Sequence, residues 1–251
     1  MTSDWPMMLG EQMFVDESVR LYRADCTELL DDPRMEACVD HVITDPPYDA
    51  KTAARRMSTR GGAPAKVCGA EHLAAVDGAL LGHRLVRLAR RWAIAFCALE
   101  QLGAYELGAA DAWVRAGVFA RIAPMPQITG DRPGQAAEGI AIMHRVGRKR
   151  WNGGGSAAMW RARSHAHLTG EHLEHPTPKP LPLMRELIRQ FTDPGDLILD
   201  PFCGSGTTGL AARLEGRRCI LIERHGPYAE EAARRLARMP GEKDGQGALP
   251  W

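Results

Sequence analysis

The sequence lacks the patterns that would direct a chain to a membrane or to an oxidising compartment. No apolar run approaches the roughly 20 residues that a transmembrane helix needs, and the first residues have neither the basic nor the apolar region of a secretory signal. The 6 cysteines include no Cys-x-x-Cys pair, which favours reduced thiols. We therefore expect a cytoplasmic protein without membrane contact.

The chain also lacks a large net charge and internal repeats. Its formal net charge is +1, so there is no overall attraction to nucleic acid, and any such affinity has to come from local clusters of Lys and Arg. With 251 residues, 45% of them hydrophobic, the chain suits one domain with a core of useful size. We expect residues 1–251 to form that single domain.

A short motif stands at the end of an apolar run. Residues 41–44 read as a buried strand, and Asp45, Pro46, Pro47 and Tyr48 follow directly. Ligand crevices of open α/β sheets lie outside the carboxyl ends of strands, and consecutive prolines hold the neighbouring carbonyls outward. A carboxylate, a carbonyl and an aromatic ring suit the amine of a nucleobase taken out of its stack. The alternative is a proline-stiffened turn with a packed tyrosine.

A second motif joins an apolar strand to a glycine-rich turn. The strand covers residues 197–200, and the turn Pro201-Phe202-Cys203-Gly204-Ser205-Gly206-Thr207-Thr208 leads into a helical pattern over residues 209–215. Glycines let the backbone approach a ligand, and a helix N-terminus attracts a polar or anionic group. The second motif therefore predicts a cofactor site.

Jointly, Asp45-Pro46-Pro47-Tyr48 and Phe202-Cys203-Gly204-Ser205-Gly206 resemble the motifs of the S-adenosylmethionine-dependent DNA amino-methyltransferases, which methylate N6 of adenine or N4 of cytosine. Their order is that of the permuted β class. His175-Pro176-Thr177-Pro178-Lys179-Pro180 is similar to motif ten of that family, and residues 151–155 resemble a segment of small phage and bacterial members. The resemblance covers nearly the whole chain.

The resemblance implies a fold and a cofactor. The fold is a doubly wound, mostly parallel, seven-stranded Rossmann-like α/β sheet with an antiparallel hairpin strand, although hydrophobic periodicity alone supports only alternating α/β structure. The cofactor is S-adenosylmethionine. Its site would comprise Asp25, Lys179, Asp200, Phe202, Gly204, Ser205, Gly206, Thr207 and Glu223.

Three of these cofactor residues have individual expectations. The family places an acid like Asp25 at the adenine amine, but here Ala24 replaces the usual glycine, and Asp25 also has capping-box spacing to Glu28. Lys179 is expected at the methionine carboxylate. Glu223 ends a strand about 20 residues beyond the glycine turn, the spacing of a ribose ligand. Pairing with Arg224 is the alternative for Glu223.

Two basic segments are candidate DNA contacts. Residues 49–70 read as a basic mobile loop, or alternatively as a solvated insertion. The candidate DNA-recognition segment is 145–175, and the stretch from 139 to 170 contains no Asp or Glu. Phosphate or base contacts are expected from Arg148, Lys149, Arg150, Trp151 and Arg161, with Trp160 nearby. A solvated charged face is the alternative. The histidines at 165, 167, 172 and 175 lack a zinc-ligand pattern.

Hydrophobic periodicity places the remaining elements. We expect helices at residues 71–91, 105–116, 182–192 and 227–239, and strands at 19–25, 92–99, 118–125, 138–144 and 218–223. Residues 124–133 are a candidate wall of the base pocket, with a plain surface connection as the alternative. Residues 240–251 read as a frayed tail.

The function expected from the resemblance is methylation of N6 of adenine in double-stranded DNA by base flipping and direct transfer. Asp before Pro-Pro-Tyr goes mostly with adenine in the family, and N4 of cytosine is the alternative. A methyltransferase acting on RNA or a protein amide, and an inactive DNA-binding relative, are alternatives from other classes. We also expect a homodimer. The sequence identifies no metal, recognition site or restriction partner.

Overall fold

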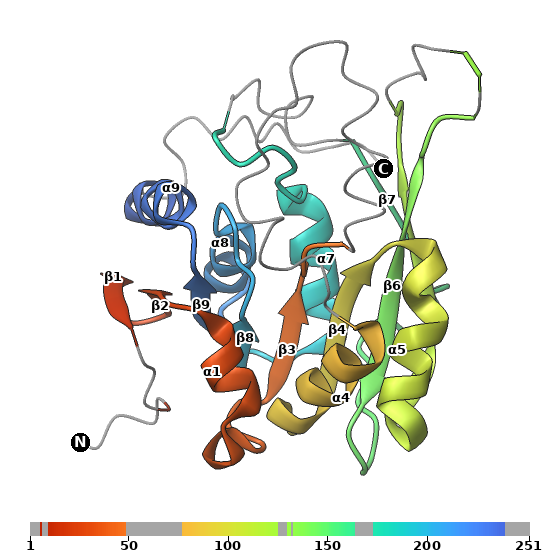
Figure 1. The fold of residues 1–251 in the computed structure, drawn as a ribbon, viewed down its shortest axis with the longest axis horizontal. Helices are drawn as coiled ribbons and strands as arrows, with labels where there is room; N and C mark the ends of the chain where they lie inside the picture. Colours follow the sequence, from red (N-terminus) through yellow and green to blue (C-terminus); the bar gives the residue numbers. More distant parts are fainter. Residues whose placement is uncertain are drawn as a thin grey trace.

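The computed structural model describes residues 6, 10–48, 77–124, 130–131, 133–163 and 173–238 (Figure 1). Several expectations lie outside these residues: the basic loop at 49–70, most of the first turns of the helix expected from 71, the centre of the 124–133 segment, three of the four histidines, and the tail. They remain expectations.

Within the described residues, one nine-stranded sheet has the order β1-β2-β9-β8-β3-β4-β6-β5-β7. β6 is antiparallel to both β4 and β5, and β1 is antiparallel to β2, whereas the other neighbours are parallel. The strands are β1 (Glu11–Val15), β2 (Val19–Arg23), β3 (His41–Thr44), β4 (Trp92–Cys97), β5 (Trp113–Arg121), β6 (Ala137–His144), β7 (Met159–Ala162), β8 (Leu197–Asp200) and β9 (Arg218–Glu223).

The seven strands from β2 to β5 in this order form the expected doubly wound sheet with its antiparallel hairpin. The expected number of strands was too small, because β1 and β7 each add a strand at one edge. β7 lies within the segment read as a DNA contact, and its side chains alternate between exposed and buried. Four residues are too short for such alternation to be distinguished from an irregular basic segment before the neighbouring strand is known.

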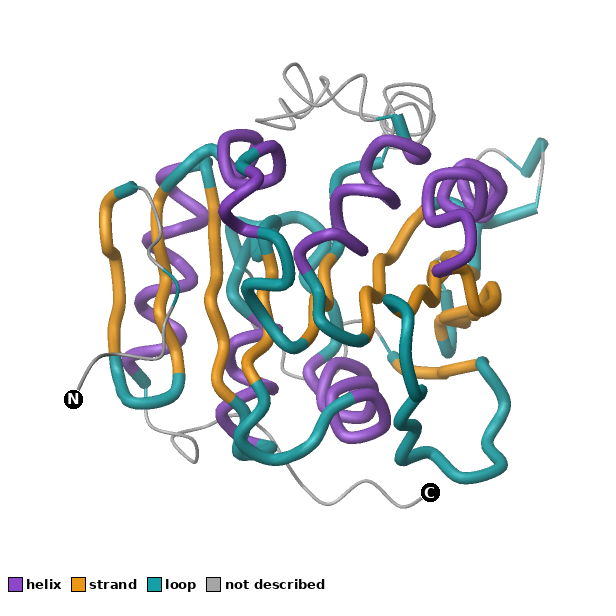
Figure 2. The backbone as a smooth tube through the Cα atoms, turned by 90° about the horizontal axis from the view of Figure 1, so that it is seen from below, coloured by secondary structure: helices purple, strands orange, loops and turns teal. Residues whose placement is uncertain are grey.

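Helices cover both faces of the sheet (Figure 2). Buried side chains of α1 (Cys26–Asp31), α4 (Gly78–Leu88) and α5 (Leu102–Ala109) pack on one face. Those of α7 (Leu181–Phe191), α8 (Thr207–Leu214) and α9 (Gly226–Ala237) pack on the other. The described helices include none with both the length and the apolar character to cross a membrane.

The largest error in the expected elements concerns residues 105–116. α5 ends at Ala109, and Ala110 has a φ of 47°, which stops the helix. After a 3₁₀ turn at Ala110–Ala112, β5 begins at Trp113, where pairing with Met143 of β6 extends the hairpin. Pairing with a distant strand therefore overrides the local helical pattern.

Candidate functional site

Asp45 lies directly after the carboxyl end of β3. All four residues of β3 are buried, and the strand lies between β8 and β4 near the middle of the sheet. The Asp45 side chain is 24% exposed and Pro46 is buried, whereas Pro47 and Tyr48 are partly exposed. The structure confirms the expected strand at residues 41–44 and the position of the motif at its end.

Lys179 contacts Asp45. Its Nζ atom donates to Oδ2 of Asp45 and lies 3.2 Å from Oε2 of Glu138. The same ammonium lies 4.8 Å from the ring centroid of Phe96 and 5.9 Å from that of Tyr48. The structure thus brings Lys179 to the residue assigned to the target amine, while its contact with a cofactor carboxylate stays a prediction.

Glu138 is a site residue that the sequence reading missed. It is 1% exposed on β6, and Arg121 at the end of β5 also contacts its carboxylate. The signal was present, because Glu138 is the only acid in the strand Ala-Glu-Gly-Ile-Ala-Ile-Met-His. Its significance depended on knowing which cations the hairpin brings to it.

The glycine turn after β8 requires glycine at two positions. Gly204 and Gly206 have φ values of 52° and 78°, in the left-handed region, and Gly206 caps the N-terminus of α8. A Cβ atom on Gly204 would lie 2.7 Å from Nε2 of His175. Burial, together with the charge of Lys179, lowers the pKa of His175 to about 4. A neutral imidazole therefore packs against the turn.

Glu223 connects the end of β9 to this turn. Its Oε2 accepts from the backbone N–H of Gly204 at 3.0 Å, and its Oε1 accepts from that of His225 at 2.7 Å. Burial raises the pKa of Glu223, while the two backbone hydrogen bonds oppose that shift. The alternative of a pair with Arg224 is wrong, since Arg224 instead lies 3.3 Å from Asp25.

Asp25 caps the N-terminus of α1, which was the alternative to a contact with the cofactor. Its Oδ1 accepts from the backbone N–H of Thr27 at 3.0 Å. Burial alone would raise the pKa of Asp25, but the bonds from Thr27 and the charge of Arg224 lower it overall. Asp25 also lines a cavity of about 270 Å³, together with Ala24, Leu29, Met35 and Ile222. Capping and a place at a cavity are therefore compatible.

Asp200 lies under the turn. It accepts from the hydroxyl groups of Thr44 at 2.7 Å and Thr208 at 2.5 Å, and from the N–H of Phe202 at 3.1 Å. Burial raises the pKa of Asp200 to about 6, although these hydrogen bonds lower it in part. Asp200 therefore joins the ends of β3 and β8, which is a supporting position for the site.

Ser205 and Thr207 are buried and contact α9. Arg235 donates from Nη1 to the carbonyl oxygen of Ser205 at 2.5 Å and to Oγ1 of Thr207 at 3.2 Å. A hollow of about 40 Å³ lies above the turn, and its lining includes Asp45, His175, Lys179, Gly204 and Thr207. Residues from the two sequence motifs thus face one hollow, although they are far apart in the chain.

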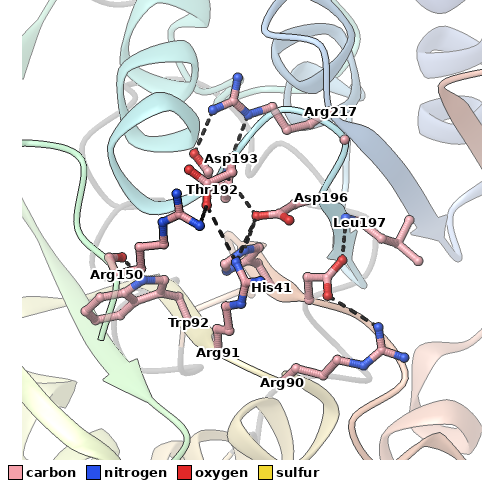
Figure 3. A network of polar contacts seen from close by, with 12 residues as sticks. His41, Arg90, Arg91, Trp92, Arg150, Thr192, Asp193, Asp196, Leu197 and Arg217 are labelled. Atoms are coloured by element: carbon pink, nitrogen blue, oxygen red, sulfur yellow. Dashed lines mark hydrogen bonds and ion pairs between the residues drawn. The ribbon is translucent and has the colours of Figure 1, made fainter. Parts of the chain in front are cut away.

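The basic segment at 145–175 does not form one surface. β6 runs from the carboxyl edge of β4 to its amino edge, where His144 pairs with Trp92, and the Nε1 atom of Trp92 donates to the carbonyl of Arg150 at 2.7 Å (Figure 3). Arg148, Lys149 and Arg150 therefore lie at the edge of the sheet opposite to Asp45. The phosphate contacts expected of these three residues stay a prediction, at the edge of the sheet opposite to Asp45.

The segment itself contains few acids, but acids from other parts of the chain pair with its cations. Asp193 lies 3.1 Å from Nη1 of Arg150, and Glu36 lies 2.5 Å from Nη2 of Arg145. Figure 3 shows that Arg150 and Asp193 belong to a polar network around His41 and Asp196, at the amino ends of the strands. These contacts are typical of structural ion pairs.

The two tryptophans pack inward. Trp151 stacks edge-on against Phe191 with ring centroids 4.8 Å apart, and Trp160 is 2% exposed. Trp160 is therefore not a surface wedge. Arg161 is exposed on β7, which runs parallel to β5, so that Arg161 and the exposed Arg163 approach the carboxyl edge where Asp45 lies.

Neither a metal nor a thiol nucleophile is indicated by the described part of the chain. No group of His, Cys, Asp and Glu there has the arrangement of a metal site. Cys97 is the thiol affected by Asp45; burial and then the Asp45 charge raise its pKa to about 12. A thiol with that pKa stays protonated at neutral pH, so Cys97 is not activated as a nucleophile.

Comparison with known proteins agrees with this geometry. Residues 122–234 match a family model described as DNA methylase. The DNA adenine methyltransferase YhdJ of Escherichia coli (strain K12) is 44% identical over 70 residues, which are 28% of this chain and 24% of that protein. The type II methyltransferase M2.DpnII of Streptococcus pneumoniae is 49% identical over 63 residues, 25% of this chain and 24% of that protein. These matches span about a quarter of each relative.

Solved structures match over most of the chain. The M1.HpyAVI–SAM complex is 26% identical with a TM-score of 0.65 and covers 87% of this chain and 100% of that one. The cytosine-N4-specific PvuII DNA methyltransferase is 17% identical with a TM-score of 0.67 and covers 91% and 90%, which supports the fold alone. Together with both motifs, these matches show that the chain is similar to the S-adenosylmethionine-dependent DNA amino-methyltransferases.

Proposed function

We propose that this protein transfers the methyl group of S-adenosylmethionine to N6 of adenine in double-stranded DNA. The observation that carries the proposal is the hollow shared by Asp45 and the glycine turn. The target-amine motif and the cofactor motif stand at the carboxyl ends of the adjacent strands β3 and β8, so donor and acceptor can meet in one place.

The residues present fit S-adenosylmethionine at its adenosine end. Asp25 and Ile222 line the 270 Å³ cavity, and the partly buried carboxylate of Glu223 stands at the end of β9 beside them. A carboxylate in that position suits ribose hydroxyl groups. The hollow of about 40 Å³ at the glycine turn is lined by His175, Lys179 and Gly204 and lies where the methionine end is expected. The motif-ten resemblance assigns Lys179 to that carboxylate.

S-adenosylmethionine, when bound, supplies an electrophilic methyl group. The chain's own residues orient the acceptor. The Asp45 carboxylate and the Pro46 carbonyl accept the two hydrogens of the amine, which draws electron density onto its nitrogen, and Tyr48 offers a ring face to the flipped base.

Adenine is favoured over cytosine by the acid at position 45, because a carboxylate accepts more strongly than the hydroxyl group found in many cytosine enzymes of the resembling family. The name of the E. coli relative, an adenine methyltransferase, supports the same choice. Cytosine N4 is the second candidate, and the width of the pocket around Tyr48 decides which ring enters.

DNA approaches the carboxyl edge of the sheet in this proposal. Arg161 and Arg163 are exposed there and contact phosphates.

We further propose a homodimer, since the described fold adds no second domain to surround the duplex. Light scattering that gives a monomer would contradict it. The type II name of the S. pneumoniae relative supports a place in restriction and modification.

The test is methyl transfer from labelled S-adenosylmethionine to duplex DNA, RNA and protein in parallel, followed by digestion to nucleosides and mass spectrometry. N6-methyladenine from duplex DNA is the expected product. N4-methylcytosine alone would show that the pocket selects the base independently of Asp45. Label in RNA or protein only would exclude a DNA substrate.

A further inference from the structure

A buried carboxylate stands behind the residue assigned to the target amine. Glu138 is 1% exposed on β6, and its Oε2 atom lies 3.2 Å from the Lys179 ammonium, which also contacts Asp45. Arg121 contacts the other oxygen of Glu138. The chain therefore assembles two carboxylates and two cations in the order Asp45, Lys179, Glu138, Arg121.

A glutamate such as Glu138 is energetically unfavourable on a buried strand. An ionised carboxylate removed from water destabilises the fold unless cations and hydrogen bonds compensate it. Glu138 meets Phe119 across the hairpin, and the next five residues of β6, from Gly139 to Met143, are apolar. Local violations of the binary pattern concentrate at functional sites, where the residue is needed for something other than stability.

The sharing of the Lys179 ammonium between two carboxylates suggests a role for Glu138. An ammonium that faced Asp45 alone would form a one-to-one pair and cancel most of the negative charge that the amine has to meet. Glu138 provides the Lys179 ammonium with a second carboxylate, and Phe96 provides it with a ring face at 4.8 Å. Lys179 is thereby held between two acids, and its position also holds the Asp45 carboxylate.

We propose that Glu138 is a positioning residue for methyl transfer: through the Lys179 ammonium that it shares, it orients the Asp45 carboxylate and preserves its negative charge. This inference rests on the proposed function, which assigns Asp45 to the target amine. Glu138 itself does not touch the substrate. The strand hairpin β5–β6, which carries Glu138 and Arg121, thereby takes part in the chemistry at β3.

The test compares Glu138→Gln, Lys179→Gln and the double variant in the full-length protein. Glu138→Gln keeps the side-chain shape and removes the charge, and we expect kcat to fall by about tenfold to a hundredfold, the range of one misplaced hydrogen bond to a charged group. The KM for S-adenosylmethionine should stay within about twofold. Because Glu138 acts through Lys179, the double variant should be no slower than Lys179→Gln alone.

A matched control and a conservative variant separate positioning from support of the fold. Asp196→Asn removes a carboxylate from the buried contact with His41, 2.9 Å away at the opposite edge of the sheet, and should lower thermal stability with kcat unchanged. Glu138→Asp keeps the charge and should recover part of the lost rate. A kcat within twofold of wild type in Glu138→Gln, or independent losses that add in the double variant, would overturn the inference.

Failure of the proposed function gives a different result. A wild-type protein that does not methylate duplex DNA refutes that function, and a crystal structure of Glu138→Gln then decides the positioning itself. We expect the Asp45 carboxylate and Lys179 to move together in that variant. An Asp45 side chain in its wild-type position would show that Glu138 does not orient it.

Discussion

The carboxylate of Glu223 accepts a hydrogen bond from the backbone N–H of Gly204, 3.0 Å away and 19 residues earlier in the chain. This bond joins the end of β9 to the turn after β8, so that the two parts assigned to the cofactor are fixed relative to each other. A carboxylate with two oxygens can serve a backbone N–H and a ribose hydroxyl group together.

Glu223→Gln should therefore weaken binding of S-adenosylmethionine by about tenfold, as expected for the loss of one hydrogen bond to a charged acceptor. Isothermal titration calorimetry measures the change. Glu230→Gln is the matched control, because Glu230 lies on the exposed side of α9 with only a long contact of 3.9 Å to Arg234. Equal affinity in the two variants would remove Glu223 from the cofactor site.

Gly204→Ala should destabilise the fold and abolish cofactor binding. The substitution combines a left-handed backbone with a contact of 2.7 Å to the His175 ring, and we expect a loss of about 2 kcal/mol or more in the free energy of unfolding. Gly195→Ala isolates the backbone contribution, since Gly195 has a φ of 85° and a Cβ atom there meets nothing within 4 Å. Urea unfolding of both variants gives the difference, which should shrink when His175→Ala is added to Gly204→Ala.

Asp45→Ala should abolish methyl transfer and leave the affinity for S-adenosylmethionine within about twofold, because Asp45 is assigned to the acceptor amine and not to the donor. Turnover on duplex DNA and calorimetry measure the two quantities separately. Asp111→Ala, at an exposed position before β5, is the control for removal of a carboxylate. Normal turnover in Asp45→Ala would refute the assignment of the site.

Replacing Arg161 and Arg163 by Gln should weaken duplex binding at every sequence and flatten its salt dependence, as loss of phosphate contacts does. The matched control is a triple substitution of Arg148, Lys149 and Arg150 by Gln, which removes more charge but from the opposite edge of the sheet. Binding titrations between 50 and 200 mM salt, roughly the range over which such contacts are lost, compare the two. A larger effect of the triple substitution would move the DNA surface to the amino edge.

His175 should make the protein sensitive to acid. Its pKa in the folded protein is lowered to about 4 from 6.5, so the unfolded chain takes up a proton first as the pH falls. The stability that depends on a neutral His175 is present above pH 6.5 and is lost as the pH falls towards 4, by about 3 kcal/mol at that limit. His175→Gln should remove this loss in urea unfolding at pH 7 and pH 4.5.

The contribution of Asp200 to stability should change with pH in the opposite direction to that of His175. Burial raises its pKa to about 6 from 3.8, so its contribution to stability is fully present below pH 3.8 and is lost as the pH rises from there through 6. Asp200→Asn should therefore reduce the gain in stability on acidification, whereas His175→Gln reduces the loss. The same direction of change in both variants would contradict this account.

The sequence by itself determined the strands that carry the two motifs. β3, β8 and β9 have the expected bounds. Short apolar runs bounded by prolines, glycines and a final acid leave little choice between strand and helix. The positions of Asp45, Gly204 and Glu223 at strand ends follow from those runs alone. The resemblance to a known family depended on the same residues.

Only the tertiary structure decided what each charged side chain meets. Glu138 and Lys179 are 41 positions apart in the printed sequence, and the ion pair between them exists because β6 begins beside the carboxyl end of β4, the strand next to β3. Conversely, Arg150 and Arg161 are close in sequence but reach opposite edges of the sheet, since the chain turns from β6 into a strand running the other way. Hydrophobic periodicity reports which face of an element is buried, whereas partners of a charge depend on strand order and direction, which local sequence does not contain.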